Sequence, residues 1–134
     1  MIAILRNREG GVFRHDLHAL GVSYDVPPTN EAPTGRCLIF VTPDAQRTMN
    51  TFLGASVHLT SRDIDPRLIA RAKIVYLEGY LFDPPDAQEA FRTAARLAHA
   101  AGGKVSLTLS DPFCVDRHRD AFLDLVEHHV DILF

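Results

Sequence analysis

The sequence predicts an α/β fold in which helices flank a parallel sheet. Two short segments rich in β-branched residues, 73–79 and 104–110, enclose a segment at 84–101 whose apolar residues recur with a helical period. This order is typical of parallel neighbouring strands joined by a right-handed crossover. A further helix at 116–129 and a strand at 130–134 extend the pattern to βαβαβ.

Length and composition restrict the class of protein. The chain has 134 residues, of which 46% are hydrophobic, enough for one packed domain. Its net charge of -3 gives no basic footprint, so we expect no nucleic-acid partner. There is no apolar run of membrane-spanning length and no secretory signal, so we expect no membrane partner and a cytoplasmic protein. Cys37 and Cys114 lie far apart and are expected to be reduced thiols.

Two strand-like segments, 36–42 and 46–53, predict a β-hairpin because proline and aspartate occupy the intervening turn at 43–45. Alternation places Arg47 and every second residue after it on one face of the second strand. Neither face is purely apolar, as expected of a sheet that covers a ligand. The alternative is a solvated edge hairpin.

The smaller predicted elements are a short strand at 1–5, an amphipathic helix at 12–20, a strand at 22–26, a proline-rich loop at 27–33 and a short helix at 65–72. Ser61 or Asp63 is expected to cap this last helix.

A carboxylate and an aromatic residue follow each of the two main strands. Glu78 and Tyr80 come at the end of the first strand, and Asp111 and Phe113 come at the end of the second. Ligands of parallel sheets bind beyond the carboxyl ends of the strands, so these side chains predict half of a small-molecule site. The alternative is that Gly79 and Pro112 simply mark the ordinary transition from a strand to a loop. The histidines form no metal motif, and we predict no metal site.

The segments 47–55, 75–80, 107–113 and 130–134 resemble, in order and spacing, the middle of PfkB/ribokinase-type kinases, with adenosine kinases the nearer group. The resemblance implies a partial ribokinase-like fold, a parallel sheet with flanking helices plus a small β-hairpin lid. Residues 1–134 would form a single partial α/β domain, with the lid inside 22–55 and the βαβαβ part of the central sheet in 56–134. Such enzymes transfer the γ-phosphoryl of ATP, with Mg²⁺, to a hydroxymethyl group of a sugar or nucleoside.

The resemblance also implies roles for individual residues. Arg47 would be catalytic, because it matches an arginine that approaches the transferring phosphates. Glu78 would accept sugar hydroxyls. The remaining substrate-binding positions would be Cys37, Met49, Thr51 and Leu53 on the lid, and Tyr80 and Phe113 against a nucleoside base.

Three motifs of the family have no counterpart in this sequence: a glycine-rich substrate motif, an Asn-Glu-x-Glu motif and a Gly-Ala-Gly-Asp motif. The last supplies the anion hole and the catalytic base, so we expect a fragment that is inactive alone. ATP and Mg²⁺ are expected cofactors of the full-length kinase, and no cofactor is assigned to the fragment itself. The alternative is a non-catalytic ligand-binding or dimerisation module, with a homodimer through the lid hairpin.

Overall fold

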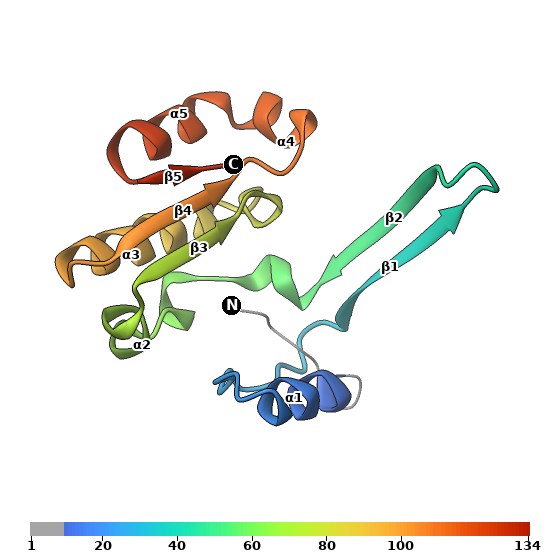
Figure 1. Cartoon of the computed structure of the whole chain (residues 1–134), viewed down its shortest axis with the longest axis horizontal. Helices are drawn as coiled ribbons and strands as arrows, with labels where there is room; N and C mark the ends of the chain where they lie inside the picture. The colour runs from blue at the N-terminus through green and yellow to red at the C-terminus, as the bar shows by residue number, and fades with distance from the viewer. Residues whose placement is uncertain (1–9) are drawn as a thin grey trace. The chain divides into compact units, whose positions relative to one another are not determined.

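The computed structural model describes residues 10–134, so the predicted strand at 1–5 lies outside the described part. Contacts divide the chain into two compact units, Met1–Val57 and His58–Phe134, and each unit is considered by itself (Figure 1). The predicted α/β class is confirmed, with a three-stranded parallel sheet, a separate antiparallel hairpin and helices.

The first unit begins with helix α1, Gly10–Ala19. The strand predicted at 22–26 is wrong, because this segment pairs with no other strand. Side chains of α1 bind its carbonyl groups instead: Arg14 donates to the Val26 carbonyl at 2.7 Å, and a ring nitrogen of His18 lies 3.0 Å from the Tyr24 carbonyl oxygen. The segment with alternating apolar residues therefore binds side chains of a helix and not the backbone of a neighbouring strand.

The predicted hairpin is confirmed as β1, Thr34–Val41, and β2, Arg47–Gly54, in antiparallel register (Figure 1). Cys37 pairs with Thr51 and Ile39 with Met49, so alternate residues of both strands share a face. The hairpin leads into the short 3₁₀ helix η1, Ala55–His58.

The second unit opens with two capped turns, η2 at Ser61–Asp63 and α2 at Pro66–Arg71. The caps differ from those predicted. Thr60 caps η2 in a reciprocal arrangement with Asp63, and the Asp65 side chain accepts from the Arg67 N–H to cap α2. Ser61 and Asp63 therefore belong to a separate turn and do not cap the following helix.

The sheet of the second unit has the order β3-β4-β5, and all three strands are parallel. The strands are Ile74–Glu78, Lys104–Thr108 and Ile132–Leu133. Helix α3, Pro85–Ala100, makes the crossover between the first two strands, as predicted. Its buried stripe consists mostly of alanine, which lets the helix approach the sheet closely.

A cluster of aromatic rings holds the helices together on one face of the sheet. Phe82 is fully buried, and its ring centroid lies 5.4 Å from that of Phe91 in α3 and 4.5 Å from that of Phe122 in α5. Arg92 and Asp124 add an ion pair between the same two helices, with 3.6 Å between nitrogen and oxygen. Both helices therefore cover the same face, as expected when two right-handed crossovers run in the same direction.

The single helix predicted at 116–129 is two helices, α4 at Pro112–Arg117 and α5 at Arg119–His128. Asp111 caps α4 and Pro112 occupies its first turn, so the helical segment begins four residues before the predicted start. His118 leaves helical geometry, with φ -130° and ψ 29°, and separates the two helices.

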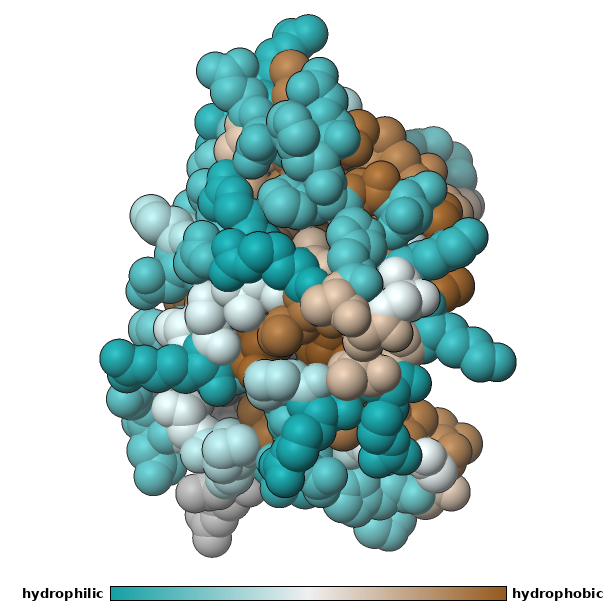
Figure 2. Space-filling model, turned by 90° about the vertical axis from the view of Figure 1, so that its left-hand side faces the viewer, coloured by the Kyte–Doolittle hydropathy of each residue, from teal (hydrophilic) through white to brown (hydrophobic). Residues whose placement is uncertain are grey.

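The surface is mainly hydrophilic on the face that Figure 2 shows, with hydrophobic patches between the polar side chains. Between residues 10 and 134, no helix is both long enough and apolar enough to cross a membrane.

Candidate functional site

The carboxyl ends of β3 and β4 lie side by side at one edge of the sheet (Figure 1). Glu78, the last residue of β3, pairs in register with Thr108, the last residue of β4. The chain continues from β3 into the 3₁₀ helix η3, Gly79–Leu81, and from β4 through Ser110 and Asp111 into α4. The two predicted pairs of carboxylate and aromatic residues thus come from the same edge of the sheet.

Both oxygens of the Glu78 carboxylate accept hydrogen bonds. The hydroxyl of Ser110 donates to Oε1, and the hydroxyl of Tyr76 donates to Oε2 at 3.1 Å. Desolvation, and to a smaller extent this hydrogen bond, raises the pKa of Tyr76. These two bonds hold Glu78 in place. A carboxylate oxygen can accept more than one hydrogen bond, so Glu78 still retains acceptor capacity.

Gly79 allows the ends of the two strands to approach each other. A Cβ at this position would lie 2.6 Å from the Thr108 carbonyl oxygen and 2.7 Å from the Ser110 hydroxyl. The Gly79 carbonyl accepts a hydrogen bond from the buried thiol of Cys114 at 3.2 Å, and burial raises the pKa of that thiol. Backbone contact between the strand ends therefore requires a residue without a side chain.

Asp111 is held by a backbone donor on the other side of the edge. Its carboxylate accepts from the backbone N–H of Cys114 at 2.8 Å. This bond most of all, with a further contribution from the Tyr80 hydroxyl, lowers the pKa of Asp111. The same carboxylate raises the pKa of Tyr80, because ionising the phenol would remove the donor and add a like charge.

Two aromatic rings beside these carboxylates are exposed. Tyr80 is 47% exposed and Phe113 is 75% exposed. The Tyr80 hydroxyl lies near enough to Asp111 for that carboxylate to raise its pKa, and Phe113 follows Pro112 in the first turn of α4. The edge of the sheet therefore combines fixed hydrogen-bond acceptors with open apolar faces, the pairing that binding sites for small polar ligands use.

A third acidic group, Asp83, connects the loop after β3 to the end of α4. Arg117 donates to its two oxygens at 3.1 and 3.2 Å, and a ring nitrogen of His118 lies 2.8 Å from Oδ1. Burial alone would raise the pKa of Asp83, but the His118 and Arg117 contacts lower it. These bonds fix α4, and with it Asp111 and Phe113, relative to the end of β3.

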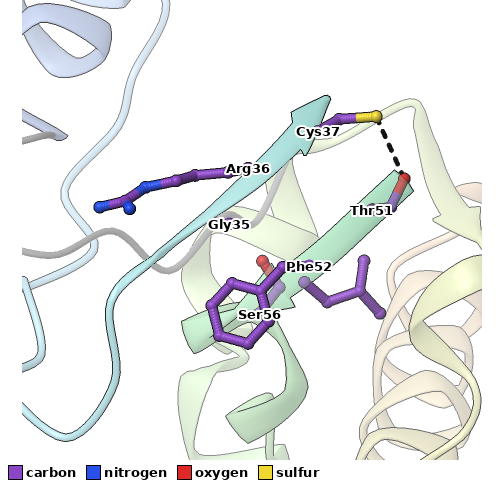
Figure 3. A pocket seen from close by; sticks show the side chains of 7 residues that line it. Gly35, Arg36, Cys37, Thr51, Phe52 and Ser56 are labelled. Carbon is purple, nitrogen blue, oxygen red and sulfur yellow. Dashed lines mark hydrogen bonds between the residues drawn. The ribbon is translucent and has the colours of Figure 1, made fainter. Parts of the chain in front are cut away.

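The other predicted site residues lie on the hairpin, in the first unit. Cys37 and Thr51 point toward each other across the strands, with 3.2 Å between sulfur and hydroxyl oxygen, whereas Arg36 points the other way (Figure 3). They contribute to a hollow of about 240 Å³, lined by Gly35, Arg36, Cys37, Thr51, Phe52, Leu53 and Ser56. Arg47 and Met49 lie further along the exposed strand, toward the turn.

Sequence reasoning missed Ser110, Tyr76 and the Asp83 cluster. Alternation along β3 could have placed Tyr76 on the same face as Glu78, two residues away. The Asp111-Pro112 pair could have indicated a helix start. Nothing in the sequence indicated that Ser110 would adopt a φ of 70°, because serine does not favour that region.

A scan against protein-family models matches residues 7–134 to the pfkB family carbohydrate kinase model. A search of curated proteins gave no match. Among solved structures, a probable sugar kinase from Rhizobium etli CFN 42 is 48% identical with a TM-score of 0.90, over 98% of this chain and 41% of that one. An adenosine kinase from Sinorhizobium meliloti is 46% identical with a TM-score of 0.91, over 100% of this chain and 42% of that one.

A more distant structure, a putative ribokinase II from E. coli in complex with ATP and Mg²⁺, has a TM-score of 0.82 at 24% identity, over 98% of this chain and 44% of that one. This likeness shows the fold alone. The chain thus spans about two fifths of the length of the solved relatives that it matches.

The effect of Asp111 on Tyr80 can be tested by titration. Asp111→Asn should lower the pKa of Tyr80, because it removes the negative charge that disfavours the phenolate, while asparagine still caps α4. The pKa of Tyr24, raised by burial, should stay unchanged and serves as the internal control. ¹³Cζ NMR of the tyrosines at increasing pH measures both, and an unchanged Tyr80 titration would contradict this effect of Asp111.

Proposed function

Because the chain belongs to the pfkB family of carbohydrate kinases, we propose that it forms the substrate-facing part of an ATP-dependent kinase. The substrate would be a sugar or nucleoside phosphorylated on a hydroxymethyl group. The observation that carries this proposal is the Glu78 carboxylate, held by two hydroxyl donors at the edge of the sheet beside exposed aromatic rings.

Glu78 would bind the sugar ring. A fixed carboxylate with remaining acceptor capacity matches the hydroxyl groups of a pentose, and a hydrogen bond to a charged acceptor is stronger than a neutral one. Such a bond is made in the ground state and in the transition state alike, so it supports affinity more than the rate of the chemical step.

A nucleoside fits this edge better than a sugar alone. Tyr80 and Phe113 offer apolar ring faces next to the two carboxylates, and a purine base is a flat partner for such faces. The 46% identical adenosine kinase structure supports the same substrate class. In the lid hairpin, the proposed substrate-binding residues are Cys37, Met49, Thr51 and Leu53.

Arg47 would act on the phosphates. During phosphoryl transfer, the hydroxymethyl oxygen forms a bond to the γ-phosphorus as the bond to the bridging oxygen of ADP breaks. A guanidinium would stabilise the charge spread over the equatorial oxygens. The part of the chain that the structure describes has no group of three His, Cys, Asp or Glu side chains suited to a metal ion. We therefore assign none of the described residues to Mg²⁺.

The 134 residues by themselves should transfer no phosphoryl group, because nothing in their sequence matches the Gly-Ala-Gly-Asp motif that supplies the base and anion hole in this family. The second candidate is therefore a module that binds ligand or a second copy without chemistry. The hairpin favours it, because both faces of the two strands expose apolar side chains, and an isolated two-stranded hairpin is marginally stable.

The binding role can be tested on the 134-residue chain by calorimetric titration with adenosine. Glu78→Gln should weaken binding about tenfold or more, because the charge-assisted bond to a hydroxyl is lost. Glu127→Gln, the same change at an exposed position in α5, is the matched control and should bind as the unaltered chain does. No binding by the unaltered chain, or equal affinities for all three proteins, would contradict the proposed site. Turnover of ATP with adenosine would contradict the expected inactivity.

Self-association through the hairpin has its own test. A second copy would cover the face that carries Leu38, Phe40 and Phe52, each more than half exposed. Sedimentation equilibrium should show dimers for the unaltered chain and monomers for Phe40→Glu. Leu20→Glu, a matched change at an exposed position after α1, should leave the dimer intact. A monomer over a wide concentration range would refute the hairpin dimer.

A further inference from the structure

Ser110 adopts a backbone conformation that serine disfavours. Its φ is 70°, and Ala45, with φ 64°, is the one other non-glycine residue with positive φ in the part of the chain that the structure describes. Ala45 lies in the hairpin turn, where such a conformation closes the two strands. Ser110 follows a buried parallel strand, where no hairpin turn requires it. Strain of this kind persists where surrounding contacts maintain it, and it concentrates at functional sites.

The contacts around Ser110 explain what the conformation achieves. Its backbone N–H donates to the Thr108 hydroxyl at 3.3 Å, and the next N–H, that of Asp111, donates to the Leu109 carbonyl at 3.0 Å. This tight turn directs the Ser110 hydroxyl to Glu78 Oε1, across the space that a side chain at position 79 would occupy. From the opposite side, the hydroxyl of Tyr76 reaches Oε2 of the same carboxylate.

We propose that Ser110 and Tyr76 are positioning residues that fix the Glu78 carboxylate so that it accepts one particular hydroxyl of the substrate. This inference rests on the proposed function, because it assigns the selectivity of the same site. With one donor on each oxygen, the carboxylate cannot turn to follow a displaced hydroxyl, and little rotamer freedom remains to be lost on binding. A polar group fixed in this way discriminates against analogues that lack the matching hydroxyl.

The left-handed backbone allows the hydroxyl to be separated from simple stability. Ser110→Ala and Ser110→Gly both remove the hydroxyl, but glycine adopts positive φ without strain and alanine does not. The glycine variant should therefore be the more stable of the two by chemical denaturation, yet both should lose the same affinity. Ser110→Asn retains a donor in a residue that tolerates positive φ, so it should recover part of the loss.

Calorimetric titration of the 134-residue chain with adenosine, 2′-deoxyadenosine and 3′-deoxyadenosine tests the proposal. Ser110→Ala, Ser110→Gly and Tyr76→Phe should each weaken adenosine binding about tenfold. The loss should vanish for the deoxy analogue that lacks the hydroxyl bound by Glu78, and it should vanish in a Glu78→Gln background. Affinity that follows stability, with glycine better than alanine, or an equal loss for all three ligands would overturn the positioning role.

Side-chain coupling constants of Glu78 separate this inference from the proposed function. If the unaltered chain does not bind adenosine, the proposed function fails, and the couplings still decide the positioning role. They should report one rotamer in the unaltered chain and rotamer averaging in Ser110→Ala and Tyr76→Phe. An unchanged single rotamer in these variants would overturn the inference even if adenosine binds.

Discussion

The close approach of the β3 and β4 ends at Gly79 is the constraint on which the candidate site depends. With no Cβ at this position, the Thr108 carbonyl and the Ser110 hydroxyl occupy the space beside the strand end. The buried thiol of Cys114 then reaches the Gly79 carbonyl from α4. One residue without a side chain thus brings together a strand end, a turn and the start of a helix.

This packing determines the state of the two carboxylates. A tyrosine hydroxyl acts on each, since Tyr76 donates to Glu78 and Tyr80 helps to lower the pKa of Asp111. Each carboxylate also accepts from a donor in the segment after β4, but these donors differ: a serine hydroxyl binds Glu78, and a backbone N–H binds Asp111. Asp111 is therefore committed to capping α4, whereas the side chain of Glu78 makes no capping bond and remains available to a ligand. The asymmetry favours Glu78 over Asp111 as the group that contacts the proposed substrate.

Sequence periodicity predicted most of the fold because burial imposes it. Helix α3 and the β-branched strands around it carry periodic apolar residues because each packs on a core. The hairpin could be predicted because Pro43 and Asp44 lie between two strand-like segments. The strand expected at 22–26 failed because alternation reports an extended chain but does not supply a partner. Helix α4 differs from the prediction because Asp111 and Phe113 were assigned to the ligand-facing end of a strand, whereas Asp111 caps a helix that begins at Pro112.

The candidate site was predictable as residue types at a sheet edge, but its hydrogen bonds were not. Glu78, Tyr80, Asp111 and Phe113 follow strands in the sequence, so parallel pairing places them together. The contact between Ser110 and Glu78 arises from a φ that the residue type does not favour, and no periodicity encodes it. The roles of Arg47 and of the lid residues rest on family resemblance, and they remain predictions.

A titration of the ¹⁵N-labelled 134-residue chain with adenosine, followed by ¹H–¹⁵N correlation spectra, measures directly whether the ends of β3 and β4 bind a nucleoside, as proposed. We predict that the amide signals of residues 78–80 and 110–114 with an N–H shift most, and that those of α2 and the C-terminal half of α3 stay unchanged. Shifts that avoid these strand ends, or the absence of any shift at saturating adenosine, would contradict binding at this site.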